Sequence, residues 1–154
     1  MITSWRITTV QFGESAFDGD GARIYGGRWN SRGVRVVYTS SSAALAALEL
    51  LVRAGRKKPL SDYLLFACLF DESLVEDLEK SQLPSEWKIA PPPDGLHAFG
   101  DAWLASGSSA ALRVPSAIIE TESNYLLNPE HGDFAKIEIR DPIPFSLDLR
   151  LLRH

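Results

Sequence analysis

GGRWNSRGVRVVYTSSSAALAALELLVR, residues 26–53, is the segment from which we interpret the rest of this chain. From residue 43 to residue 52 it contains only Ala, Leu and Val, apart from Glu49. A helix that is apolar on every side is buried, and a buried carboxylate is unfavourable unless it is paired or hydrogen-bonded. We therefore predict a buried helix over residues 42–53, with Glu49 as a candidate functional group. In the alternative interpretation, Glu49 only reaches solvent or pairs with an arginine of the core.

The first half of this segment is typical of a β-hairpin. Two expected strands, residues 23–30 and 34–39, are joined by a three-residue turn that ends at Gly33, at the position that requires a positive φ. Side chains alternate between the two faces of a sheet, so this register places Arg28 and Tyr38 diagonally adjacent on one face. A two-residue turn would separate them, so the prediction depends on the length of the turn.

The remaining elements follow from short apolar runs separated by glycine, proline and polar residues. Strands are expected over residues 2–10, 61–70, 111–119 (one or two strands), 133–139 and 145–152. A helix that ends at Gly107 is expected over residues 94–107, with four residues directed to the core: Leu96, Phe99, Trp103 and Leu104. Loops and turns are expected over residues 11–22, 84–93 and 124–129, and polar surface with a short helix over residues 71–80.

The composition is that of an ordinary soluble globular protein. Hydrophobic residues make up 45% and charged residues 23% of the 154 residues, which is sufficient for a full core without disulfides. We therefore expect a single domain over residues 1–154, of the α+β class, with mostly antiparallel β-sheets. The net charge of -4 argues against a nucleic-acid-binding protein, because such proteins usually carry a basic surface. Without a membrane-spanning apolar stretch or a secretory signal, the chain is expected to be cytoplasmic and to bind neither nucleic acid nor membrane.

The motifs argue against several common kinds of site. The sequence has neither a GxGxxG nor a GxxxxGK[ST] phosphate-binding loop. Its histidines show no metal-binding spacing, and the single Cys68 lies in an apolar run, so we expect no metal site and a cysteine that packs in the core. A Ser–His–Asp hydrolase that uses Ser116 and His131 is an alternative, but VPSAI around Ser116 lacks the glycines of a nucleophile elbow.

Three side chains of the opening segment have complementary chemistry. Arg28, beside two glycines, suits a phosphate or pyrophosphate, which accepts paired hydrogen bonds. The ring of Tyr38 can stack on a planar group. The Glu49 carboxylate can hold a ribose hydroxyl or stabilise an oxocarbenium-like transition state. Together they suit a ligand that carries phosphates, a ribose and an aromatic leaving group.

Six blocks, in order along the chain, resemble the RES-domain toxins of bacterial RES–Xre toxin–antitoxin pairs. The blocks are WRI at residues 5–7, GGRWN at 26–30, VVYTS at 36–40, ALELLV at 47–52, VPSAI at 114–118 and NYLLNPEH at 124–131. The resemblance extends over nearly the whole chain, although residues 71–110 carry little of it.

This resemblance implies a fold similar to that of mono-ADP-ribosyltransferases and an active site that acts on NAD+ by glycohydrolysis or phosphorolysis. Carried over by motif, the catalytic residues are Arg28, Tyr38, Glu49 and Ser116, of which Ser116 orients the ligand by hydrogen bonding. The substrate-binding residues are Arg6, Gly27, Ser40 and Asn124. NAD+ is then a substrate and phosphate a candidate co-substrate, and no cofactor is implied.

The resemblance also implies a role and a partner. The chain would be a toxin that depletes the cell of NAD+, restrained by a helix-turn-helix antitoxin of the Xre type that covers the pocket. Two other functions stay open: a mono-ADP-ribosyltransferase that modifies a cellular protein, and a non-catalytic nucleotide-binding module. A homo-oligomer and a hetero-oligomer with the antitoxin are both compatible with these functions.

Overall fold

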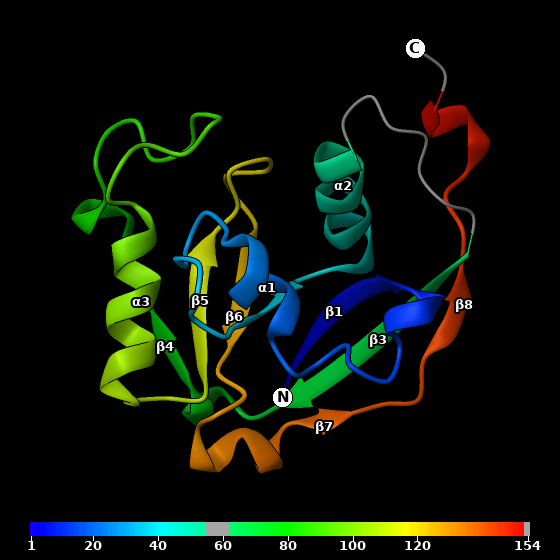
Figure 1. Cartoon of the computed structure of the whole chain (residues 1–154), viewed down its shortest axis with the longest axis horizontal. Helices are drawn as coiled ribbons and strands as arrows, with labels where there is room; N and C mark the ends of the chain where they lie inside the picture. The colour runs from blue at the N-terminus through cyan, green and yellow to red at the C-terminus, as the bar shows by residue number, and fades with distance from the viewer. Residues whose placement is uncertain (55–61, 153–154) are drawn as a thin grey trace.

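The fold is built on one curled, eight-stranded sheet, seen in a computed structural model that describes residues 1–54 and 62–152 (Figure 1). The strands are β1 (Ile2–Thr9), β2 (Val37–Ser40), β3 (Tyr63–Phe70), β4 (Val75–Asp77), β5 (Ala111–Pro115), β6 (Ser123–Leu127), β7 (Glu138–Ile139) and β8 (Ile143–Phe145). The α-helices are α1 (Asp20–Tyr25), α2 (Ala43–Ala54) and α3 (His97–Ser106). Short 3-10 helices are η1 (Val10–Phe12), η2 (Glu72–Leu74), η3 (Lys80–Gln82), η4 (Gly132–Lys136) and η5 (Leu149–Leu152).

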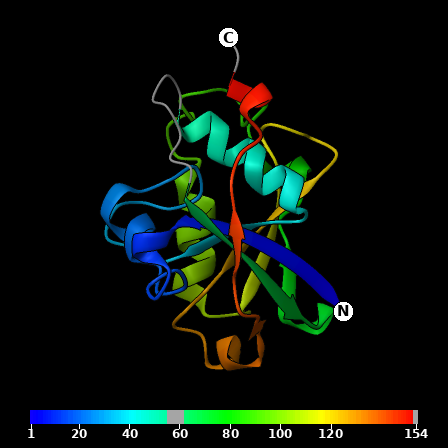
Figure 2. The same ribbon diagram turned by 90° about the vertical axis from the view of Figure 1, so that its right-hand side faces the viewer.

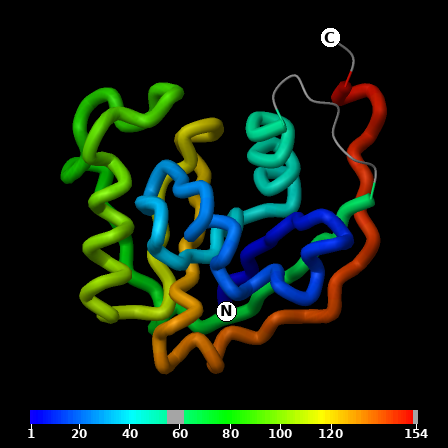
Figure 3. Tube along the Cα trace, in the orientation of Figure 1, coloured from blue at the N-terminus to red at the C-terminus, as the bar shows by residue number. Residues whose placement is uncertain are grey.

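The sheet has the strand order β4-β5-β6-β2-β1-β3-β7, and β8 also pairs with β3. Among the described strands, β4 and β5 are parallel and the other pairs are antiparallel. The expected α+β class and the mostly antiparallel sheet are therefore confirmed. Figure 3 shows how the chain leaves β1, forms α1 and returns to the sheet as β2, so that sequence-distant β6 lies beside β2.

Each half of the sheet is covered by its own helix. Helix α3 packs on β5 and β6, where Trp103 shares a buried cluster with Val114 and Leu126. Helix α2 lies over the other half of the sheet (Figure 2). There, Ala46 packs in a second buried cluster with Ile7 of β1 and Leu65 of β3. The two charged groups predicted for the site, one before β2 and one on α2, therefore belong to different halves of the molecule.

The predicted helix at residues 42–53 is confirmed, but the prediction that it is completely buried is wrong. Helix α2 begins after Ser42, whose hydroxyl accepts a hydrogen bond of 3.0 Å from the Leu45 N–H, as expected of an N-cap. Only Leu45 and Ala46 are buried along it, and Val52 is 62% exposed. Because the sheet covers one face of the helix, its apolar composition did not imply an apolar environment on every side.

The predicted hairpin is also wrong. Residues 20–25 form helix α1, which ends at Gly26 with φ of 71°. A tight turn follows, in which the Gly27 N–H donates to the Asn30 carbonyl at 3.0 Å. Strand β2 starts only at Val37 and pairs with β1 and β6, so the register argument for Arg28 and Tyr38 fails. The positive φ predicted for Gly33 is confirmed, at 94°.

Several short elements also differ from their predictions. Residues 124–129, expected to be a turn, lie mostly in β6 between β5 and β2. The strand expected over 133–139 is mainly η4, and that over 145–152 is replaced by the end of β8 and by η5. Strand β4 was missed within residues 71–80, and α1 begins within the expected loop 11–22. Such short strands are defined by their neighbours in the sheet rather than by their own periodicity.

Other predicted elements are confirmed. Helix α3 ends at Gly107, with φ of 61°, and Leu96 and Trp103 are buried beside it. Residues 84–93 form no regular element, and β5 covers the start of the region 111–119. Strand β1 pairs along its whole length with β3, which begins two residues after the predicted start at 61; residue 61 itself lies outside the described residues.

Candidate active site

The turn that carries Arg28 is held against Tyr38 on β2. The Tyr38 hydroxyl donates to Asn30 Oδ1 at 2.6 Å and accepts the Trp29 N–H at 3.2 Å. A Cβ atom at Gly27 would lie 2.6 Å from that hydroxyl, so a side chain here would force Tyr38 or the turn to shift. Burial raises the pKa of Tyr38 above its usual value, and the phenol therefore stays protonated. Arg28 and Tyr38 are neighbours as predicted, but through a turn and not through a hairpin.

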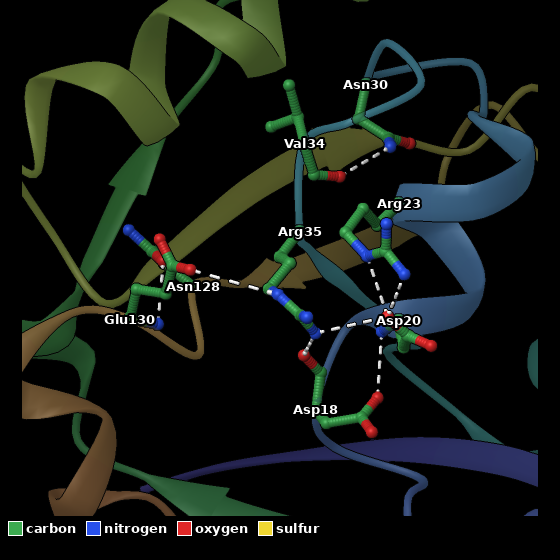
Figure 4. Close-up of polar contacts among 8 residues, drawn as sticks. All are labelled: Asp18, Asp20, Arg23, Asn30, Val34, Arg35, Asn128 and Glu130. Atoms are coloured by element: carbon green, nitrogen blue, oxygen red, sulfur yellow. Dashed lines mark hydrogen bonds and ion pairs between the residues drawn. The ribbon is translucent and has the colours of Figure 1, made fainter.

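Asn30 and Trp29 fix the same turn from inside. Asn30 is 1% exposed, and its amide donates to the carbonyls of Ala22, Ser31 and Val34, the last of which is drawn in Figure 4. Trp29 is 2% exposed, and its carbonyl lies so close to Gly100 of α3 that a Cβ there would collide with the backbone. The Arg28 turn is thus clamped between β2 and α3.

A network around Arg35 anchors helix α1, which leads into this turn (Figure 4). The Arg35 guanidinium donates to the Asp18 carbonyl at 3.1 Å and lies 3.4 Å from the Asp20 carboxylate. It also lies 4.0 Å from Glu130, in the segment that follows β6. Asp20 in turn pairs with Arg23 at 2.7 Å. Exposed ion pairs of this kind contribute little individually, but together they connect α1 to two other segments.

Arg28 itself is half-buried and directed by backbone carbonyls. Its Nη1 donates to the carbonyls of Trp87 at 2.7 Å and Ile89 at 3.0 Å, both in the proline-rich segment. Burial lowers the pKa of Arg28, while the charge of Glu49 and the Tyr38 hydroxyl oppose this shift. The other N–H groups of the guanidinium make no hydrogen bond within the described residues. They can therefore bind an anionic ligand.

Glu49 lies on α2 and is held by β6. Its Oε1 accepts a hydrogen bond of 2.9 Å from Asn124 Nδ2. The half-buried side chain of Glu49 still reaches solvent in part, and its hydrogen-bond partner among the described residues is Asn124 and not an arginine. Asn124 Oδ1 is buried and has no hydrogen-bond partner among the described residues. Ser40, which faces Asn124 across the β2–β6 pair, is also buried.

Arg6 and Ser116 are occupied in the protein's own backbone. Arg6 donates to the carbonyls of Ala16 at 2.6 Å and Tyr38 at 3.0 Å, and burial lowers its pKa to about 10. Ser116 is fully buried just beyond β5, and its hydroxyl accepts the N–H groups of Ile118 and Ile119, each at 3.1 Å. The structure therefore groups Arg28, Tyr38, Glu49 and Asn124, while Arg6 and Ser116 support the surrounding backbone.

Comparison with known proteins places this chain in a family. The sequence model of the RES domain matches residues 3–148. The chain belongs to the RES family. The "Toxin Res" of Photorhabdus laumondii is 37% identical over 150 residues, covering 97% of this chain and 96% of the relative. The "Prs ADP-ribosylating toxin" of a Sphingobium strain is 40% identical over 159 residues, covering 99% of both.

A solved structure has the same fold. The toxin–antitoxin complex MbcT–MbcA of M. tuberculosis contains a chain that superposes on this RES protein with a TM-score of 0.76. The match covers 94% of this chain and 84% of that chain, at 20% sequence identity. At that identity the likeness concerns the fold.

Sequence reasoning about this RES chain missed the carbonyl groups that direct Arg28. Trp87 and Ile89 lie in the segment 84–93, which was expected only to be irregular. The signal that could have marked it is Trp87, a large aromatic residue among prolines that is buried beside Trp29. Asn30, in the GGRWN block, was also not singled out.

The described residues show neither a metal centre nor a hydrogen bond between Ser116 and His131. Within residues 1–54 and 62–152, no three His, Cys, Asp or Glu side chains are arranged to hold a metal ion. His154 lies outside these residues. His131 Nδ1 accepts the Asp133 N–H at 2.9 Å within its own turn, and no hydrogen bond joins it to Ser116. Cys68 is buried in the core, as predicted, and burial raises its pKa to about 12. No described helix is long and apolar enough to cross a membrane.

Proposed function

We propose that this protein is the toxin of a toxin–antitoxin pair and cleaves the bond between nicotinamide and ribose in NAD+. Family membership and the toxin names of the relatives support the first part. The second part rests chiefly on one observation: a carboxylate, Glu49, is held by Asn124 within electrostatic reach of a cation, Arg28, which is also within electrostatic reach of the phenol of Tyr38. This pairing of an anion-binding group with a carboxylate suits a nucleotide whose glycosidic bond is to be broken.

Each group has a distinct part in the proposed reaction. Arg28 binds a phosphate of NAD+ through the N–H groups that the Trp87 and Ile89 carbonyls do not use. The protonated Tyr38 packs against the nicotinamide or its ribose. Glu49 accepts hydrogen bonds from the ribose hydroxyls and stabilises the positive charge that develops on the sugar. The electron pair of the broken C–N bond goes to the nicotinamide ring nitrogen and neutralises it. Water or phosphate then captures the ribosyl cation and loses a proton.

The reaction is tested by replacing the carboxylate with an isosteric amide. Glu49→Gln keeps the size of the side chain and its ability to accept from Asn124, but removes the negative charge. We expect nicotinamide release from NAD+ to fall by at least about 100-fold, because electrostatic stabilisation of a developing charge contributes this much, with an unchanged Tm. If purified Glu49→Gln consumes NAD+ at the parental rate, the mechanism is wrong. If the wild-type protein releases no nicotinamide, the non-catalytic binding module is favoured.

A second candidate function is transfer of ADP-ribose to a protein. It is favoured by the name of the Sphingobium relative, an ADP-ribosylating toxin. Mass spectrometry of the products separates the acceptors. Free ADP-ribose indicates water, ADP-ribose 1″-phosphate indicates phosphate, and a mass increase on a co-incubated protein indicates transfer. Running the reaction with and without phosphate in the buffer completes the comparison.

The proposed role requires a partner that restrains the toxin in the cytoplasm. The fold is shared with a chain from a toxin–antitoxin complex, and we propose a helix-turn-helix antitoxin of the Xre type that covers Arg28 and Glu49. Co-expression with such a neighbouring gene product should restore growth and block nicotinamide release. A stable complex that leaves nicotinamide release unchanged would contradict coverage of Arg28 and Glu49.

A further inference from the structure

The guanidinium of Arg28 is directed by two carbonyl groups that flank a single lysine. Arg28 Nη1 bonds the carbonyls of Trp87 and Ile89 at 2.7 and 3.0 Å. Lys88 lies between them, so the position of Lys88 and the direction of both carbonyls depend on the same short stretch of backbone. Whatever holds Lys88 in place therefore also directs Arg28.

Lys88 is held by the loop that joins β5 to β6. Its Nζ lies 2.8 Å from Glu120 Oε2, and Lys80 Nζ donates to the Glu120 carbonyl at 2.9 Å. The Lys88 and Glu120 side chains are 50% and 47% exposed. Each of the two can therefore be replaced without disturbing the core, and each contributes only a modest interaction.

The loop that carries Glu120 is closed by Ser116. The Ser116 hydroxyl accepts from the N–H groups of Ile118 and Ile119, and its own N–H donates to the Glu122 carbonyl at 3.0 Å. A second backbone bond of 2.9 Å joins the Glu122 N–H to the Ile119 carbonyl. Ser116 thus determines the shape of this loop in the way that a capping serine determines the start of a helix.

An apolar contact connects the same loop to the Arg28 turn. Ala117, the residue after Ser116, packs against the buried cluster that contains Trp29 and Trp87. Trp29 follows Arg28 directly, and Trp87 supplies one of the two carbonyls. The loop therefore reaches the surroundings of Arg28 by two routes, one through an ion pair and one through packing.

We propose that Ser116, Glu120 and Lys88 are positioning residues that direct Arg28 toward the phosphates of the substrate. Ser116 then acts on the site through the loop between β5 and β6 and not by contacting the ligand. Its complete burial and its two bonds with backbone N–H groups are the observations that favour this indirect role. The kinetic part of the inference rests on the proposed function, because its readout is the consumption of NAD+.

The first test breaks the ion pair at the surface. Lys88→Met should raise the KM for NAD+ about two- to fivefold, the range expected for one exposed pair. The kcat should change much less, because Arg28 binds the phosphates in the ground state and in the transition state alike. The exchanged pair Lys88→Glu with Glu120→Lys should restore most of the KM. The matched control is Lys136→Met, which removes a similar exposed ion pair with Asp133. It should leave the KM for NAD+ unchanged.

A double-mutant cycle then separates the two roles of Ser116. Ser116→Ala should raise the KM for NAD+, whereas Ser116→Thr should keep it near the wild-type value because the hydroxyl is kept. The effects of Ser116→Ala and Lys88→Met on KM should not add, because both act through one loop. Additive effects, or an unchanged KM in Lys88→Met, would overturn the proposal. Should Ser116→Ala fail to fold, the exchanged Lys88–Glu120 pair still decides it.

A measurement without substrate distinguishes failure of this inference from failure of the proposed function. The Arg28 side-chain N–H signals in a 15N spectrum of the full chain are assigned by their loss in Arg28→Lys. We expect slow exchange with water in the wild type, faster exchange in Lys88→Met, and no change in Lys136→Met. If NAD+ is not consumed but the Arg28 signals respond in this way, the positioning stands and the proposed reaction falls. If the exchange rate of the Arg28 N–H groups is the same in Lys88→Met as in the wild type, the positioning role is overturned.

Discussion

The two charged groups of the site are held in different ways. Arg28 lies on a turn whose neighbours Trp29 and Asn30 are almost fully buried and whose backbone touches α3. Glu49 lies on α2, a helix with two buried residues, and one hydrogen bond from Asn124 directs it. The Arg28 turn is therefore fixed by packing, whereas the carboxylate is held by a single polar contact among the described residues. Substitutions of the buried residues in the Arg28 turn should therefore lower stability first, and substitutions near Glu49 should lower activity first.

The largest expected effect is on the Arg28 side. Trp29→Ala removes a side chain that packs with Trp87 at a ring-centroid distance of 6.4 Å. It should lower the free energy of unfolding by about 3–5 kcal/mol, as other large-to-small changes in cores do. Urea denaturation measures this loss of free energy. The control is Phe12→Ala, because Phe12 is 56% exposed. A loss below 1 kcal/mol would show that the turn is not fixed by packing.

The Glu49 side should respond in the opposite manner. Asn124→Ala removes the amide that donates to the Glu49 carboxylate at 2.9 Å. Hydrogen bonds to charged groups contribute about 1.5–3 kcal/mol, so kcat/KM for NAD+ should fall about 10- to 100-fold while Tm changes little. Ser123→Ala, on the same strand, serves as the control. An unchanged kcat/KM would show that Glu49 does not depend on Asn124.

Gly27 tests how tightly the turn is packed against Tyr38. Gly27→Ala places a methyl group 2.6 Å from the Tyr38 hydroxyl, and overpacking of this kind destabilises by about 1–3 kcal/mol. Adding Tyr38→Phe removes the opposing oxygen and should recover part of the loss. Urea denaturation of both single variants and the double variant gives the coupling. Strict additivity would argue against a direct contact.

The smallest effect concerns pH. Burial raises the pKa of Tyr38 above 10, so at alkaline pH the unfolded chain releases this proton before the folded chain does. The folded state then binds more protons, and the free energy of unfolding must fall as pH rises above 10. By pH 11 the loss from this group should be about 1.4 kcal/mol. Between pH 8 and pH 11, the Tm of Tyr38→Phe should fall less than the Tm of the wild type. Parallel curves of Tm against pH would contradict the raised pKa of Tyr38.

The sequence was informative where a segment carries its own signal. The Ser42 cap and the Ala–Leu run define α2, and Gly107 marks the end of α3, because these signals act locally. The sequence failed where partners far along the chain decide the structure. Strand β6 is a strand because β5 and β2 flank it, and nothing within residues 124–129 indicates those neighbours.

The site shows the same division. Arg28 and Tyr38 were expected to be neighbours for a reason that the structure contradicts, since a turn that ends in contact with the Tyr38 hydroxyl replaces the hairpin. Glu49 was singled out because it interrupts an apolar helix; the structure places it half-buried and bonded to Asn124, and its role stays a prediction. Trp87 marks the segment 84–93 in the sequence, but not the hydrogen bonds from Arg28 to the Trp87 and Ile89 carbonyls, because every residue carries a backbone carbonyl.

The position of Asn124 late in the chain has a consequence during synthesis on the ribosome. A nascent chain that has reached α2 already contains Arg28, Tyr38 and Glu49, but the amide that directs Glu49 belongs to β6. Strand β6 also completes the central part of the sheet by pairing with β2 and β5 at once. Under the proposed function, the growing polypeptide is therefore harmless until translation has passed residue 124, and the cell has that interval in which to supply the restraining partner.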